Sequence, residues 1–171
     1  CAGWGTHDCD NYSICVNTYD GYECNPDATC VGDFAIHDDD DAVLLELVNC
    51  AVIDGNLELN ENYVDEENEW TSGDLTSLPG LRNLKVITGN LLIQKFWHSS
   101  PDVLTGLGNL VTVGGSLTLK ELKGVEDLDG LHHLTHVGGN LKVRNNNPLQ
   151  SLGGLASLNA VGGNISVKSN S

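Results

Sequence analysis

The feature that most constrains this chain is a repeat whose period settles at 24 residues. The glycines that open successive units are Gly55, Gly89, Gly115, Gly139 and Gly163, so the steps between them are 34, 26, 24 and 24 residues. The last complete unit reads GNLKVRNNNPLQSLGGLASLNAVG. A repeat of this length is typical of a solenoid, in which each unit forms one coil and neighbouring coils stack on each other.

Alternating apolar and polar residues predict one short strand in each unit. Leu141 and Val143 alternate with Lys142 and Arg144, which is the two-residue period of a strand with one buried face. A single coil cannot bury this face alone, so the apolar side chains must pack against those of the coils above and below.

The rest of each unit has the spacing of tight turns. Leu152, Leu155 and Leu158 are three residues apart, which indicates a 3₁₀-like turn or an arc of short bends. We expect the glycine pairs at 138–139 and 162–163 to take positive φ where the chain turns into the next strand. Because aromatic residues make up only 5% of the chain and Met is absent, the sequence predicts a mainly β solenoid with an aliphatic interior.

Charge is unevenly distributed along the chain. The net charge is −16, and residues 1–74 contain 19 of the 24 acidic residues and none of the 8 basic ones, which leaves 5 acidic and 8 basic residues in 75–171. Nucleic acid is not expected as a partner, because the acidic half would repel phosphates. The asymmetry fits either a device for solubility or an electrical polarity along a rod, which would suit head-to-tail contacts between copies.

The chain shows no apolar run long enough to span a bilayer and no signal peptide, and it begins with Cys1. We therefore expect a mature or excised fragment that does not insert directly into a membrane.

The first 24 residues, CAGWGTHDCDNYSICVNTYDGYEC, contain Cys1, Cys9, Cys15 and Cys24. Dense cysteine in a short, turn-rich segment predicts disulfides and an oxidising, extracellular or cell-surface location, although spacing alone leaves three connectivities open. The segment resembles an EGF-like domain, and this resemblance implies the pairs Cys1 with Cys15 and Cys9 with Cys24. The family's closing Cys-x-Cys is replaced by CNP at residues 24–26, so the module resembles a truncated one.

The segment CVNT at residues 15–18, with Tyr22 two residues before Cys24, is also similar to the calcium-binding variety of EGF-like domain. That resemblance implies that Asn17 supplies a calcium ligand or is hydroxylated. The alternative is a disulfide module without calcium, and no other cofactor is expected.

A run of four aspartates, Asp38–Asp41, precedes the apolar stretch AVLLELV. Carboxylates near a helix N-terminus complement its dipole, so the pattern predicts a short amphipathic helix that caps one end of the solenoid. A calcium site and a solvated charge run are the alternatives for the aspartates.

From Asn49 the sequence NCAVIDGNLELNEN resembles the start of a receptor L-domain, the leucine-rich β-helix of insulin-receptor and EGF-receptor ectodomains. The later segments NLKVITGNLLI, NLVTVGGSLTL, HLTHVGGNLKV and SLNAVGGNISV match the same pattern. The resemblance implies a right-handed β-helix and a disulfide between Cys30 and Cys50 that closes the capping helix.

These resemblances divide the chain into a truncated EGF-like module at residues 1–29 and a receptor L-domain-like solenoid at residues 30–171. Within the solenoid, residues 30–54 hold the capping helix, and the acidic stretch 62–74 is an inserted loop that accounts for the long first step. No polar cap follows the last strand, so we expect the solenoid to continue beyond residue 171 or a neighbouring subunit to cover that end.

Outward positions of the predicted strands form a candidate partner-binding surface. Asn60, Gln94, Lys120, Arg144 and Lys168 occupy equivalent positions, which would place them in register about 4.8 Å apart. With Lys142 nearby, they would form a basic stripe on a flat sheet that binds protein, unless they are ordinary polar exteriors of strands.

Two tryptophans are further partner-binding candidates. Trp70 lies in the inserted loop, and such insertions often mark a binding face. Trp97 follows Phe96 just past a strand, where an aromatic pair forms either a local plug under a loop or an exposed contact point.

Catalytic motifs are lacking in the sequence: we find no Gly-x-Ser-x-Gly, no phosphate-binding glycine loop with its Lys, and no His-Glu-x-x-His. His132, His133 and His136 occupy variable positions of the repeat, which indicates surface residues rather than a metal site. A glycan hydrolase is disfavoured because no carboxylate pair can be placed. We therefore do not expect an enzyme.

Two Asn-x-Ser sequons, at Asn11 and Asn164, are candidate glycosylation sites in a secreted protein. Asn164 also aligns with Asn56, Asn90 and Asn140, so a stacked ladder of amides is an equally good explanation for it.

The sequence therefore predicts a non-enzymatic extracellular interaction module, a structural or adhesive part of a larger surface assembly such as a filament or appendage. The alternative is the ligand-binding ectodomain of a cell-surface receptor.

Overall fold

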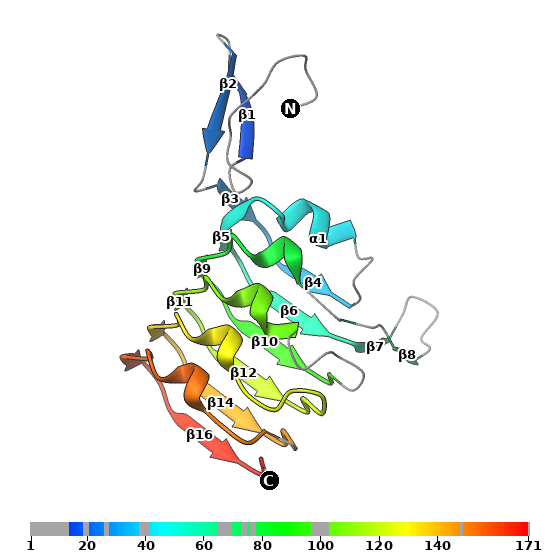
Figure 1. Cartoon of the computed structure of the whole chain (residues 1–171), viewed down its shortest axis with the longest axis vertical. Helices are drawn as coiled ribbons and strands as arrows, with labels where there is room; N and C mark the ends of the chain where they lie inside the picture. Colours follow the sequence, from blue (N-terminus) through cyan, green and yellow to red (C-terminus); the bar gives the residue numbers. More distant parts are fainter. Residues whose placement is uncertain are drawn as a thin grey trace.

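The chain is mainly β and solenoid-like, with two parallel sheets that run the length of the stack (Figure 1). The structure is a computed structural model, and it describes residues 14–18, 21–25, 28–37, 42–64, 70–72, 75, 78–96, 103–147 and 149–170. Each repeat unit contributes one strand to each sheet, and successive units lie side by side in both sheets.

We call the sheet with the longer repeat strands sheet 1. Its six parallel strands follow the chain order from one end of the stack to the other, and neighbouring strands pair without a register shift. They are β4 (Phe34–Ile36), β6 (Leu57–Asn60), β10 (Leu91–Gln94), β12 (Leu117–Lys120), β14 (Leu141–Arg144) and β16 (Ile165–Lys168).

Sheet 2 repeats the same order with strands that shorten to two residues in the later coils. It comprises β3 (Ala28–Val31), β5 (Cys50–Asp54), β9 (Val86–Ile87), β11 (Thr112–Val113), β13 (His136–Val137) and β15 (Ala160–Val161). The disulfide that the receptor L-domain resemblance implies is present: Cys30 on β3 is bonded to Cys50 on β5, with their Cα atoms 5.8 Å apart.

The third side of each later coil is a short 3₁₀ helix, as the three-residue leucine spacing predicts. These helices stack in a column (Figure 1): η1 (Pro79–Leu81), η2 (Val103–Leu107), η3 (Asp129–Leu131) and η4 (Gly153–Leu155). In the first coil the α-helix α1 (Ala42–Leu47) takes this position and packs on η1. It follows the aspartate run as predicted, with Leu44 and Leu47 buried, whereas Asp38–Asp41 lie outside the described residues.

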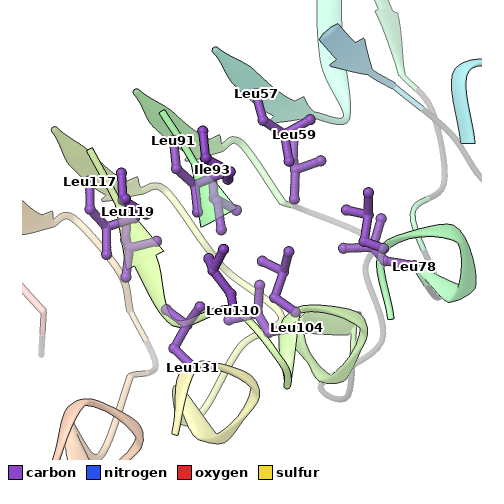
Figure 2. Close-up of a cluster of buried hydrophobic side chains, with 14 of the residues drawn as sticks. Leu57, Leu59, Leu78, Leu91, Ile93, Leu104, Leu110, Leu117, Leu119 and Leu131 are labelled. Carbon is purple, nitrogen blue, oxygen red and sulfur yellow. The ribbon is translucent and has the colours of Figure 1, made fainter. Parts of the chain in front are cut away.

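The interior is aliphatic and continuous along the stack. Inward positions of sheet 1 form rows of leucine and isoleucine that face leucines from the 3₁₀ side (Figure 2). The residues labelled there are all buried: Leu57, Leu59, Leu78, Leu91, Ile93, Leu104, Leu110, Leu117, Leu119 and Leu131. In the last coil that the structure describes, the inward-facing Ile165 and Val167 are 62% and 47% exposed.

The expected positive φ at the glycine pairs 138–139 and 162–163 is wrong. Among the described glycines only Gly32 and Gly55 have positive φ, and the left-handed residues after the strands of sheet 1 are instead Lys95, Glu121, Asn145 and Ser169. The paired glycines are needed because neighbouring coils approach closely at this corner. A Cβ on Gly138 would lie 2.0 Å from the carbonyl oxygen of Gly114.

Two parts of the inserted segment 62–74 are strands, where the sequence predicts a loop. The segment contains an antiparallel pair of strands, β7 (Asn62–Val64) and β8 (Trp70–Ser72), that projects from the edge of the stack (Figure 1). Aromatic and β-branched residues such as Tyr63 and Thr71 favour strands, and the acidic composition of the segment concealed that preference.

The cysteine-rich start contains an antiparallel hairpin of β1 (Ile14–Thr18) and β2 (Gly21–Asn25), in which Cys15 lies opposite Cys24. The predicted pairs of Cys1 with Cys15 and of Cys9 with Cys24 involve residues or side chains outside the described part of the chain. Both pairings therefore stay predictions.

Candidate interaction surface

The outward row predicted on sheet 1 lies in register. Asn60, Gln94, Lys120, Arg144 and Lys168 are consecutive Cα partners across five neighbouring strands. Parallel strands are about 4.8 Å apart, so the row crosses the outer side of the sheet as a continuous line.

The first two members of this row are not on the surface, contrary to the prediction. Asn60 is 6% exposed and Gln94 is 8% exposed. Both donate a side-chain hydrogen bond to Glu58 Oε1, at 3.1 Å from Asn60 Nδ2 and 2.8 Å from Gln94 Nε2. Their amides are therefore occupied within the sheet and do not offer a binding surface.

The later members of the row form a patch of positive charge that we call the basic cluster: Lys120, Lys142, Arg144 and Lys168. Lys142 and Lys168 are exposed, and the other two are partly exposed. Within the described residues none of the four forms an ion pair. Three neighbouring strands, β12, β14 and β16, thus hold four basic side chains whose charge is not neutralised by a described carboxylate.

The structure does not show either predicted tryptophan near the basic cluster. Trp70 is the first residue of β8, but its side chain lies outside the described part, and Trp97 lies outside it entirely. Asn17 is in β1, with its side chain likewise outside the described part, so its role in calcium binding stays a prediction.

The predicted amide ladder is present at the corner between the two sheets. Asn56 Oδ1 accepts from the backbone N–H of Asn90 at 2.8 Å, and Asn140 Oδ1 accepts from that of Asn164 at the same distance. Asp33 begins the ladder and Ser116 takes the asparagine position in its coil. Asn164 is exposed, so glycosylation there stays a prediction, whereas Asn11 lies outside the described residues.

A second ladder was not predicted from the sequence. Asn146 is fully buried, where its Oδ1 accepts from the Leu122 N–H and its Nδ2 donates to the Leu119 carbonyl, each at 3.1 Å. Asn170 repeats this arrangement one coil later by accepting from the Asn146 N–H and donating to the Val143 carbonyl. The sequence signal for this ladder is the 24-residue offset between Asn146 and Asn170, which equals one repeat.

The three predicted surface histidines are exposed: His132 and His133 follow η3 on the 3₁₀ side, and His136 begins β13 of sheet 2. His132 and His133 line a hollow of about 410 Å³ between coils, together with Arg82, Thr105, Gly108 and Asn109. The part of the chain that the structure describes contains no group of three or more His, Cys, Asp or Glu residues placed to hold a metal.

Neither a family model nor a curated protein sequence matches this chain. Across the described ranges, no helix has both the length and the apolar character needed to cross a membrane.

Proposed function

We propose that this chain is a non-enzymatic, extracellular protein-interaction module that forms a structural or adhesive part of a larger surface assembly. In this proposal residues 30–171 form a right-handed β-helix of receptor L-domain type, and residues 1–29 form a truncated EGF-like module. The stacked 24-residue coils and the disulfide between Cys30 and Cys50 support the assignment, because structural disulfides belong to oxidising compartments.

The observation that carries the proposal is the basic cluster. It lies on the sheet at one end of a stack, whereas residues 1–74 hold 19 of the 24 acidic residues and no basic one. An acidic protein surface is the complementary partner, and the acidic part of a second copy supplies one. Head-to-tail contacts of this kind are heterologous, and such contacts extend into rings or filaments.

The test is sedimentation velocity of the whole chain at low and high salt. We expect self-association at 20 mM NaCl that is lost at 500 mM, because screening shortens the Debye length from about 20 Å to about 4 Å. Lys142→Glu should weaken the association. Arg82→Glu is the matched control, since it makes the same change of charge on an exposed residue outside sheet 1.

A monomer at every salt concentration would contradict the head-to-tail part of this proposal. Equal weakening by Lys142→Glu and Arg82→Glu would show that net charge, and not the basic cluster, controls association.

A second candidate function is ligand capture by a receptor ectodomain. Sheet 1 favours this function, because an array of regularly spaced outward side chains suits an extended protein ligand. The hairpin of β7 and β8 at the edge of the stack also favours it. The full-length transcript separates the two functions. A downstream membrane-spanning segment with a kinase-like region would favour the receptor, and many further EGF-like or L-type repeats would favour the scaffold.

A further inference from the structure

The hollow on the 3₁₀ side exists because one coil has a glycine where its neighbours have large side chains. Gly108 follows η2 at the position that Arg82 takes after η1 and His132 takes after η3. A Cβ on Gly108 would lie 3.6 Å from Cε1 of His132, so the imidazole lies beside the space that a side chain at 108 would enter.

Backbone carbonyls fix the orientation of both imidazoles in this hollow. His133 Nδ1 lies 2.6 Å from the carbonyl oxygen of Gly108, and His132 Nδ1 contacts the carbonyl oxygen of Asp129. A carbonyl can only accept, so each Nδ1 carries a proton. In the neutral imidazoles both Nε2 atoms therefore keep a free lone pair, and the two ring centroids are 4.1 Å apart.

A third donor lines the same hollow. Asn109 Nδ2 donates to the carbonyl of Arg82 at 2.7 Å, which leaves the Asn109 Oδ1 as an acceptor. Histidines that bind metals almost always donate their other ring N–H to a carbonyl or carboxylate, and this bond holds the ligand nitrogen in place. His132 and His133 both meet this condition, because each donates its Nδ1–H to a backbone carbonyl.

We propose that His132 and His133 bind one Zn²⁺ ion through their Nε2 atoms, with Asn109 Oδ1 and water as the remaining oxygen ligands. Imidazole nitrogen and water are both ligands that zinc takes in proteins. The two Nε2 atoms are therefore the main donors of this site, and the neutral amide oxygen is the weakest of them. The guanidinium of Arg82 lines the hollow and opposes a cation, so the site is weaker than it would be without that charge. This proposal does not depend on the proposed function.

The test is isothermal titration of the whole chain with ZnCl₂ in a non-chelating buffer. Replacing both histidines, in His132→Ala with His133→Ala, should remove one bound Zn²⁺ per chain, and each single change should weaken that site at least about tenfold. The matched control is His136→Ala, because His136 is exposed on the same coil but its Nδ1 bonds to Thr135 Oγ1 and it does not line the hollow. Thermal melting of each variant checks that it is folded.

Arg82→Gln distinguishes a cation site from an anion site. Removing the positive charge should tighten Zn²⁺ binding if the proposal holds. The proposal is overturned if the double variant binds as much Zn²⁺ as the original chain, if His136→Ala removes the same site, or if Arg82→Gln weakens binding.

Discussion

Sheet 1 and the column of 3₁₀ helices stack with the same repeat, but different physical features hold them together. In sheet 1, ladders of parallel hydrogen bonds join the strands, and rows of buried side chains such as Leu119 fill the interior behind them. In the 3₁₀ column, buried glycines let the backbones of neighbouring coils touch. A Cβ on Gly130 would lie 2.0 Å from the carbonyl oxygen of Leu104.

This difference determines what each side of the molecule tolerates. The outer side of sheet 1 carries Glu58, Leu92, Thr118, Lys142 and Ser166 at one equivalent position, so its side chains vary freely while the backbone ladder stays the same. The 3₁₀ column repeats glycine at 80, 106, 130 and 154, since even a methyl group would collide with the coil before it. A surface for partners is therefore easier to build on sheet 1.

The largest effect should come from Gly130→Ala. The added Cβ would meet the carbonyl group of Leu104, which cannot rotate away as a side chain can. We expect a loss of about 4 kcal/mol in the free energy of unfolding, above the usual cost of overpacking, measured by urea denaturation. Gly153→Ala is the control, because among the described residues its Cβ would meet only the movable Ser151 hydroxyl, at 3.1 Å. Equal losses in the two variants would contradict the distinction between the two sides.

Leu119→Ala tests the contribution of side-chain burial to sheet 1. Leu119 is 0% exposed, and its truncation should cost about 3 kcal/mol through lost burial and a new cavity. Thr118→Ala, at the neighbouring outward position of β12, should change stability by no more than about 0.5 kcal/mol. If both changes had small effects, the interior would not be packed as the structure shows.

Asn146→Ala tests the junction between the two sides and should have a smaller effect. It leaves the Leu122 N–H and the Leu119 carbonyl without their partner, at a cost of about 2 kcal/mol. The exposed neighbour Asn147 provides the control, since Asn147→Ala removes an amide of the same size from the surface. If Asn146→Ala lowered the free energy of unfolding no more than Asn147→Ala, water would be replacing the hydrogen bonds of the buried asparagine.

The repeat made much of this architecture predictable. Equivalent positions are visible as a period, so the strands, the 3₁₀ turns, the register of Lys120 with Arg144 and the amide ladder through Asn140 followed from spacing. The resemblance supplied the pairing of Cys30 with Cys50.

The repeat period does not reveal how closely neighbouring coils approach or what surrounds each position. Positive φ was expected at Gly138, but close approach to Gly114 is what requires glycine there. Gln94 was placed on the surface because its equivalents are basic, although it is buried and its amide donates to Glu58. The hollow that His132 and His133 line depends on Gly108 of the preceding coil, and a single unit does not reveal this contact between coils.

The most direct test of the stacked arrangement is amide hydrogen exchange measured residue by residue by NMR. The N–H groups of Leu91, Leu117 and Leu141 donate to the carbonyls of Ser116, Asn140 and Asn164 in the following coil, at 2.9–3.0 Å. The account predicts that all three exchange several orders of magnitude more slowly than an unstructured chain, as amides in a cooperative core do. Exchange of Leu117 and Leu141 at the unstructured rate would contradict it.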